Sequence, residues 1–268
     1  MSQADFAFQS KYNITDLLDI MKRLRAPDGC PWDREQDHHT VRNNFLEETY
    51  EVIDAIDREN RADLCEELGD VLLQIVFHSQ MEAEVGGFDF DDVCDGICKK
   101  LIERHPHVFG TTVVSGSEQV LDNWDAIKQK SKNQTTYTQT LESVPKAFPA
   151  LMRAAKIQKR AAKAGFDWSS VAGALDKVDE ELKEFREALA KGEEVHISEE
   201  FGDLLFSMVN VSRFLKIDSE QALQSASEKF ISRFSIVEQM AIEQGIDMKS
   251  VSLEELDKLW DKAKNSNK

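Results

Sequence analysis

Acidic residues recur in one fixed pattern at two places in the chain. The first copy reads EETYE at 47–51 and EELGD at 66–70, and the second reads EELKE at 180–184 and EEFGD at 199–203. Each acid of the second copy lies 133 residues after its counterpart (181 − 48 = 203 − 70 = 133). Carboxylate oxygens are the ligands that hard divalent cations prefer. The repeat therefore predicts two cation sites and favours a metal-dependent enzyme that acts on phosphates.

Helical geometry places four acids of each copy on one flank of an apolar stripe. At 100° per residue, one stripe, expected to be buried, holds Leu64, Leu68, Val71, Leu72 and Ile75, and a matching stripe holds Phe45, Thr49, Val52 and Ile56. The candidate ligands beside them are Glu48, Glu51, Glu67 and Asp70 in the first copy and Glu181, Glu184, Glu200 and Asp203 in the second. Carboxylates gathered in this way raise one another's pKa and oppose folding unless a cation is present. Mg²⁺ is the expected cation, with Mn²⁺ as the alternative.

The apolar pattern is helical almost throughout, which predicts an all-α fold built as a tandem repeat. We expect helices at 14–25, 41–59, 62–85, 90–104, 118–131, 146–164, 171–191, 196–215, 219–243 and 252–264. The polar stretch 131–144 holds little that could pack and reads as a linker. It separates an expected N-terminal domain, 14–130, from an expected C-terminal domain, 145–268.

Composition narrows the class of partner. The net charge of −17 disfavours nucleic acid and membrane as general partners. The four cysteines form no CxxC pair, and neither a signal peptide nor an apolar run long enough for a membrane span is found, so reduced thiols in the cytoplasm are expected. No Gly-rich phosphate loop is present. Capping and solvent exposure are the expected roles of His38-His39 and of His105 and His107.

The acidic motifs and the RLR…GCPWD segment at 23–33 resemble the MazG family of nucleoside triphosphate pyrophosphohydrolases. The resemblance runs from about residue 14 to residue 264, in the long, two-domain bacterial form of the family. It implies two helical-bundle domains related to dimeric dUTPases and phosphoribosyl-ATP pyrophosphohydrolases, and a homodimer. It also implies a Mg²⁺-dependent conversion of a nucleoside triphosphate and water to the monophosphate and pyrophosphate.

The resemblance places activity chiefly in the C-terminal copy. It makes the four acids of that copy the catalytic metal ligands, and it implies nucleotide contacts from Asn210, Lys229, Arg233, Trp260 and Lys264. By residue chemistry alone, Lys229 and Arg233 can hold a departing pyrophosphate, and an ordinary surface pair is the alternative. Trp260 and Trp168 can stack on a base of any identity, or they can simply pack.

Residues around the acids differ between the copies. Phe77 stands where the second copy has Asn210, and a phenyl ring cannot hydrogen-bond a phosphate. The pair Lys100 and Arg104, which matches Lys229 and Arg233, is followed at once by Pro106, which ends the helix. We therefore expect the N-terminal copy to be weakly active or inactive.

Three functional hypotheses remain open on the sequence. The first is an enzyme of broad base specificity in nucleotide-pool sanitation or alarmone control. The second is a nucleotide-sensing adaptor that binds a regulatory protein partner and hydrolyses nucleotides only incidentally. The third is a specialised pyrophosphohydrolase for dUTP or phosphoribosyl-ATP.

Overall fold

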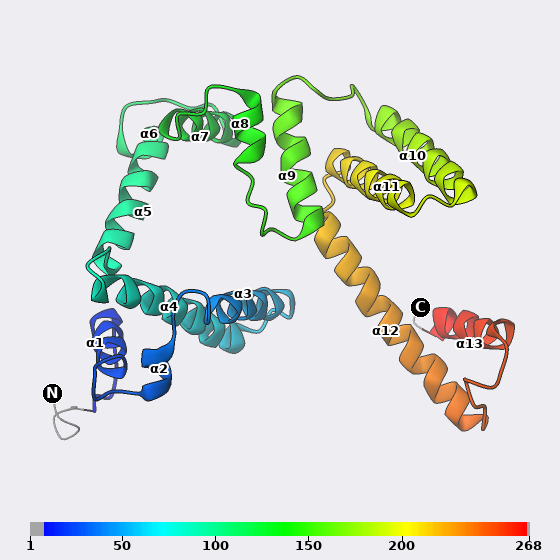
Figure 1. Cartoon of the computed structure of the whole chain (residues 1–268), viewed down its shortest axis with the longest axis horizontal. Coiled ribbons are helices and arrows are strands. Elements are labelled where there is room, and N and C mark those ends of the chain that lie inside the picture. The colour runs from blue at the N-terminus through cyan, green and yellow to red at the C-terminus, as the bar shows by residue number, and fades with distance from the viewer. Residues whose placement is uncertain (1–7, 267–268) are drawn as a thin grey trace. The chain divides into compact units, whose positions relative to one another are not determined.

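The computed structural model describes residues 8–266, and within that range all regular structure is helical, without a β-strand (Figure 1). The prediction of an all-α fold is confirmed. The first helices are α1 (Ile14–Leu24), α2 (Pro31–Glu35), α3 (Arg42–Asp57), α4 (Arg61–Glu84), α5 (Phe90–Arg104), α6 (Pro106–Phe109) and α7 (Ser117–Ser131). The others are α8 (Tyr137–Glu142), α9 (Ala150–Lys163), α10 (Val171–Lys191), α11 (Glu194–Phe214), α12 (Ser219–Glu243) and α13 (Leu253–Ser266).

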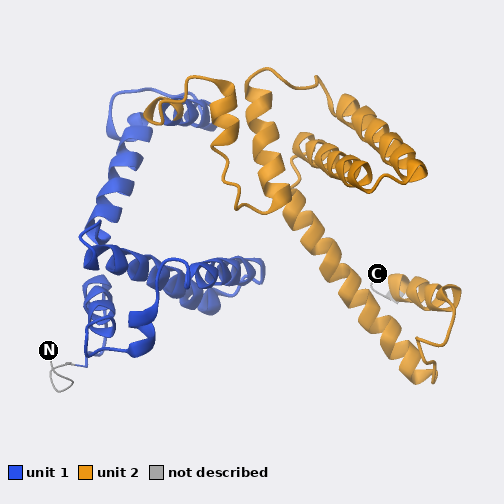
Figure 2. Ribbon diagram, in the orientation of Figure 1, with its two compact units in different colours: residues 1–128 blue, residues 129–268 orange. Residues whose placement is uncertain are grey.

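The chain divides into two compact units, and the boundary between them in the sequence falls between residues 128 and 129 (Figure 2). Each unit contains a helical hairpin that carries one copy of the acidic pattern: α3 packs on α4 in unit 1, and α10 packs on α11 in unit 2. Helix α4 begins at residue 61 and α11 at residue 194, so the offset of 133 holds for the hairpins too. The helical repeat expected from the sequence is therefore present in the fold.

Short turns hold each hairpin antiparallel. In unit 1 the turn follows α3, with Glu59 in the left-handed region at φ 53°, and the side chain of Asn60 then caps the first turn of α4. In unit 2 the same place is taken by Gly192, at φ 75°, where a residue without a Cβ is favoured. The two turns fix which faces of the long helices meet, and so bring acids from both helices of a hairpin to one side.

The core of unit 1 lies further along α4 than the apolar stripe predicts. Val76 and Phe77 of α4 are buried with Met21 of α1, whereas Leu68 is 52% exposed. On α3 the buried residue is Ala55, and Ile56, expected in the stripe, is 52% exposed. The prediction that Leu68 and Ile56 are buried is therefore wrong for a single chain.

Unit 2 contains a second core between α12 and α13, formed by Val237, Ala241, Leu259 and Ala263. Helix α12 runs on past Arg233 to residue 243, whereas α5 ends at Arg104 before Pro106. The expected difference in length between these two helices is confirmed. Proline lacks the backbone N–H that a continuing helix needs, which explains why only α5 stops there.

The polar stretch 131–144 contains helix α8, which the sequence analysis did not expect. Thr136 and Gln139 form a capping box at its start. The guanidinium of Arg160 on α9 donates hydrogen bonds to the carbonyl of Thr140 and to Oγ of Ser143, the second at 2.7 Å. The expectation that this stretch holds little that packs is therefore wrong, because hydrogen bonds from α9 anchor a helix with few apolar side chains.

No helix among residues 8–266 has the length and apolar character that crossing a bilayer requires. The four cysteines, all of them within the described range, are unbridged, as the sequence analysis expected. Helices α2 and α6, at five and four residues, were also absent from the predicted set.

Candidate functional site

The hairpin of unit 1 brings three of its four candidate ligands together. One carboxylate oxygen from each of Glu48, Glu67 and Asp70 lies within 4.8 Å of the other two. Glu51 lies against Glu67 and shares a hydrogen bond with it. Burial, followed by the charges of Asp70 and Glu51, raises the pKa of Glu48. Burial and the hydrogen bond with Glu51 likewise raise the pKa of Glu67. The first group is thus a set of mutually repelling carboxylates.

The hairpin of unit 2 also brings three carboxylates together. One carboxylate oxygen from each of Glu181, Glu184 and Glu200 lies within 4.8 Å of the other two. Glu181 is buried, at 6% exposure, although glutamate is seldom buried without a partner. Asp203, predicted as the fourth ligand, is exposed and lies outside the group of three. The two copies therefore share a three-carboxylate arrangement but differ in their third member, which is Asp70 on α4 in the first and Glu184 on α10 in the second.

A lysine and a histidine lie beside the second group, and the sequence analysis missed them. Nζ of Lys177 lies 2.5 Å from Glu181 and 3.0 Å from Glu180. Both hydrogen bonds raise the pKa of the Lys177 ammonium, and the bond with Glu181 has the larger effect. Nδ1 of His196 lies 3.4 Å from Glu200. Lys177 and His196 each precede their acid by four residues, which places the two side chains on one helix face; this spacing was the available signal.

The first group has no such neighbours at the matching positions. Subtracting 133 from 177 and 196 gives Asn44 and Asp63, an amide and a further acid. In both groups the donors are carboxylate oxygens converging from two helices, which suits a hard divalent cation and not a soft one. The residues present therefore fit Mg²⁺, and unit 2 adds a lysine that offsets the most buried acid.

Asn210, an implied nucleotide contact, is buried on α11. Its Oδ1 accepts a hydrogen bond from Nε of Arg213 at 2.8 Å, and Arg213 in turn pairs with Asp167. The carbonyl end of the amide is thus engaged within unit 2. Phe77, at the matching position in unit 1, is buried, and the guanidinium of Arg25 lies 5.2 Å from its ring centre.

The remaining implied nucleotide contacts lie on the α12–α13 pair, whereas the acids lie on the α10–α11 pair (Figure 1). Lys229 and Arg233 come from α12, and Trp260 and Lys264 come from α13. The ring of Trp260 lies 5.0 Å from that of Phe230, and Nζ of Lys264 lies 3.0 Å from Asp261. One unit therefore presents two distinct groups, one acidic and one cationic and aromatic.

Trp168 lies just before α10 and is 42% exposed. It packs against Gly173 in the first turn of that helix: a Cβ built at Gly173 would lie 2.4 Å from Cδ1 of the indole. The absence of a side chain at Gly173 therefore lets the ring lie close to the helix that carries Lys177, Glu181 and Glu184.

A histidine chain in unit 1 was also missed. Nδ1 of His38 lies 2.7 Å from Nδ1 of His78, and Nε2 of His38 lies 2.8 Å from a carboxylate oxygen of Glu82. Burial and the neighbouring His38 lower the pKa of His78. The His38 side chain is 42% exposed, and it also ties the segment before α3 to α4, a role that the sequence analysis did not predict.

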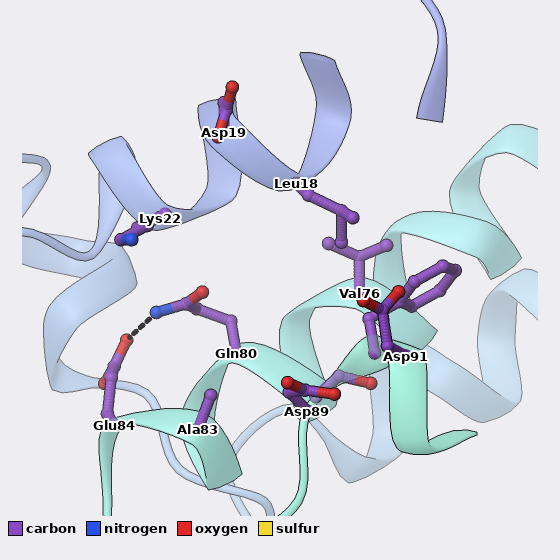
Figure 3. A pocket seen from close by; sticks show the side chains of 11 residues that line it. Leu18, Asp19, Lys22, Val76, Gln80, Ala83, Glu84, Asp89 and Asp91 are labelled. Atoms are coloured by element: carbon purple, nitrogen blue, oxygen red, sulfur yellow. Dashed lines mark hydrogen bonds between the residues drawn. The ribbon is translucent and has the colours of Figure 1, made fainter. Parts of the chain in front are cut away.

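Figure 3 shows a pocket of about 470 Å³ between α1, α4 and the start of α5. Its polar rim includes Lys22, Gln80, Glu84 and Asp89. Gln80 donates to Glu84, which also pairs with Arg25, and Asp89 caps α5. The candidate ligands of unit 1 are not among its lining residues, and we assign the pocket no role.

Comparison with known proteins identifies the family. The model of the MazG nucleotide pyrophosphohydrolase domain matches twice, at residues 36–109 and 169–238. The chain is 47% identical over 254 residues to the nucleoside triphosphate pyrophosphohydrolase of Escherichia coli strain K12, covering 94% of this chain and 97% of that protein. It is 45% identical over 249 residues to the nucleoside triphosphate pyrophosphohydrolase/pyrophosphatase MazG of Thermotoga maritima, covering 93% of this chain and 94% of that protein. The two family matches contain the α3–α4 and α10–α11 acids, and the chain therefore belongs to the MazG family.

Proposed function

We propose that this protein hydrolyses nucleoside triphosphates to monophosphates and pyrophosphate at the acids of unit 2. The observation that carries the proposal is the convergence of Glu181, Glu184 and Glu200 from two helices, next to Lys177. Membership of the MazG family supports it, since the E. coli and T. maritima relatives are named for this activity. A preference for no single base follows if the base is held by stacking.

The acids would hold Mg²⁺, which supplies polarisation of the phosphoryl oxygens and a bound water of lowered pKa. The chain's own residues supply the rest. Lys229 and Arg233 stand one turn apart on α12, where they can bind the departing pyrophosphate through charge-assisted hydrogen bonds. Nζ of Lys177 pairs with Glu181 and offsets its negative charge. Trp260, half-buried on α13, offers a ring to the base.

We also propose that the working protein is a homodimer. Phe201, Met208 and Phe230 of unit 2 are each about half exposed, as are Ile56 and Leu68 of unit 1. Apolar area of this extent is normally covered by a partner. A second copy of the chain would cover these faces. Light scattering at micromolar concentration tests this, and a monomeric mass would contradict it.

Unit 1 carries a second candidate role, that of a nucleotide-responsive regulatory half. The observation in its favour is Phe77, which fills with a buried ring the position where unit 2 has an amide. In this role the unit 1 acids would bind a cation without turnover. A protein partner would act on unit 1, and hydrolysis would stay with unit 2.

A substrate panel tests the main proposal. The full chain is incubated with Mg²⁺ and each common ribo- and deoxyribonucleoside triphosphate, together with dUTP and phosphoribosyl-ATP, and both products are quantified. We expect equimolar monophosphate and pyrophosphate, and no turnover after chelation of the metal. Diphosphate with orthophosphate as first products would overturn the assignment of attack at the α-phosphorus. Turnover confined to dUTP or phosphoribosyl-ATP would replace the broad specificity with a specialised one.

A further inference from the structure

A hydrogen-bonded network joins the segment before α10 to the end of α11 in unit 2. The guanidinium of Arg213 donates to both carboxylate oxygens of Asp167, one of them at 2.9 Å, and its Nε donates to Oδ1 of Asn210 at 2.8 Å. The Asp167 carboxylate also accepts from the backbone N–H of Trp168 at 2.9 Å. One ion pair therefore links the segment that carries Trp168 to the amide of Asn210.

This network fixes which end of the Asn210 amide faces Arg213. A guanidinium has donors only, so it can meet the amide oxygen and never the amide nitrogen. The nitrogen faces away from Arg213, and it donates to no acceptor among residues 8–266. The side chain is only 7% exposed, yet its nitrogen is not among the fully enclosed unpaired atoms of the described residues. Asn210 thus presents a spare donor that a ligand can reach.

The network lies at one end of the hairpin, away from the acids. A helix rises about 1.5 Å per residue, so Asn210 lies ten residues, or about 15 Å, beyond Glu200 along α11. The ring of Trp168 packs at Gly173, which lies eight residues, or about 12 Å, before Glu181 along α10. Because the two helices are antiparallel, both displacements run toward the same end. A triphosphate held at the acids can extend its sugar and base to that end.

Unit 1 forms its hairpin without such a network. Subtracting 133 from 167, 210 and 213 gives Arg34, Phe77 and Gln80. Arg34 donates to the carbonyl of Pro27, and Gln80 donates to Glu84, so these two side chains bond elsewhere and not to each other. An antiparallel pair of helices with three converging acids therefore does not need the network. Its presence in unit 2 alone, where turnover is proposed, favours a role in function.

We propose that Asp167 and Arg213 are positioning residues for the nucleoside of the substrate. They act through Asn210 and Trp168, and the inference rests on the proposed function. Arg213 makes the Asn210 amide present its nitrogen, so the amide meets the substrate as a donor to an acceptor atom of the sugar or base. Asp167 fixes the backbone at Trp168, so the indole and the amide keep one relative position. Groups that are ordered before binding raise affinity, because less freedom is lost when the substrate arrives.

Steady-state kinetics of the full chain test the proposal. The substrate is the triphosphate that the panel turns over fastest, and the inhibitor is tripolyphosphate, at a fixed excess of Mg²⁺. Arg213→Lys keeps the positive charge but loses the planar fork that reaches Asp167 and Asn210 together. Its KM should rise about tenfold or more while kcat stays within about threefold of wild type, because contacts to a non-reacting part of the substrate act on binding. The inhibition constant of tripolyphosphate, which has no nucleoside, should not change.

The matched control is Arg58→Lys in unit 1. Arg58 also pairs with two acids beside a hairpin, Asp54 at 2.8 Å and Asp63 at 3.0 Å. This variant makes the same chemical change at an ion pair that has no proposed part in binding. It should leave KM, kcat and the inhibition constant of tripolyphosphate as in wild type. Thermal melts of each variant show that it is folded.

A second variant tests the polarity of the amide. Asn210→Asp has nearly the same shape and keeps an oxygen for Arg213, but it replaces the donor by an acceptor. The melting temperature should not fall, because the hydrogen bond from Arg213 becomes charge-assisted, whereas KM should rise about tenfold or more. Repulsion between the new charge and the phosphates would be screened at about 1 M salt, where the Debye length is about 3 Å. The rise in KM over wild type should persist in that salt.

Each outcome decides for or against the network. An unchanged KM in Arg213→Lys, or an inhibition constant for tripolyphosphate that rises as much as KM, would overturn the proposal. A KM of Asn210→Asp that returns to the wild-type value in high salt would refute the donor role of the amide. Wild type that hydrolyses no nucleoside triphosphate would remove the proposed function and this inference with it. Active wild type with unaffected variants would remove this inference alone.

A measurement on wild type avoids reliance on variants that fail to fold. The α,β-methylene analogue of the same triphosphate resists cleavage at the bond that the reaction breaks. A crystal structure of its complex with Mg²⁺ should show the Asn210 nitrogen about 3 Å from an acceptor of the sugar or base, with Arg213 still on the amide oxygen. An amide nitrogen that meets no atom of the nucleotide, or only a phosphate oxygen, would refute the proposal.

Discussion

Replacing Glu184 by glutamine should make unit 2 more stable than wild type without Mg²⁺ and less stable than wild type with it. The oxygen of Glu184 lies within 4.8 Å of those of Glu181 and Glu200. Two unit charges at that distance repel by about 0.9 kcal/mol in water, and salt at about 0.15 M halves that value. Lys177 offsets part of the repulsion from Glu181. Without metal, Glu184→Gln should therefore stabilise the protein by about 0.5–1 kcal/mol and raise its melting temperature by about 2–4 °C.

With Mg²⁺ the order should invert. A cation held a hundredfold above its dissociation constant stabilises wild type by about 2.7 kcal/mol, and the glutamine variant should lose most of this gain along with a ligand. Turnover should fall by about 10²-fold or more, which corresponds to about 2.7 kcal/mol in the barrier.

Thermal melts in EDTA and in Mg²⁺, followed by pyrophosphate release, measure both effects. Glu187→Gln is the matched control, because Glu187 lies one turn on in the same helix and faces Lys183 at 3.8 Å instead of the acid group. If both variants respond to Mg²⁺ as wild type does, the three acids are an ordinary surface cluster and the reasoning fails.

Three further outcomes are expected. Asp70→Ala should leave pyrophosphate release within about twofold of wild type, since unit 2 has its own acids; a loss of about 10²-fold would move the working site to unit 1. Because the folded state lowers the pKa of His78, the unfolded state binds more protons, so stability should fall as pH drops below about 6.5 toward the folded pKa. His78→Val should flatten that slope in a series of chemical denaturations, and an unchanged slope would mean that another group causes it. Gly173→Ala should displace Trp168, whose Cδ1 would lie 2.4 Å from the new Cβ, and should red-shift the tryptophan emission; an unshifted spectrum in a folded variant would show that the ring yields without leaving the helix.

The apolar periodicity of the sequence predicted the long helices, and local start and stop signals predicted where several of them begin and end. Helices α5, α10 and α12 begin and end at the expected residues. The short helix α8 was not predictable in this way, because the side chain of Arg160 anchors it from another helix. Periodicity shows that a helix face is apolar, but not whether other helices of the same chain cover that face. For this reason Leu68 was expected to be buried, although it is exposed in the single chain.

The acids of the site followed from their spacing, but their environment did not. An interval of three or four residues places carboxylates on one helix face whatever lies opposite. The separation of Asp203 from the other three acids, and the burial of Glu181, depend on how α10 and α11 cross. The contact of the Arg104 guanidinium with the ring of Trp124 depends likewise on the position of α7. A single sequence does not encode these distances in any local pattern.

The two tight turns also bear on how the chain folds. Hairpins that are alike and lie 133 residues apart offer wrong pairings, such as α3 with α11, and mispairing between similar repeats is a known hazard of tandem chains. Closing the three residues between α3 and α4, or the two between α10 and α11, costs far less entropy than closing a loop of more than a hundred. Correct pairs should therefore form first and fast. Lengthening the turn at Gly192 with a flexible insert should slow refolding and increase swapped species far more than it lowers stability.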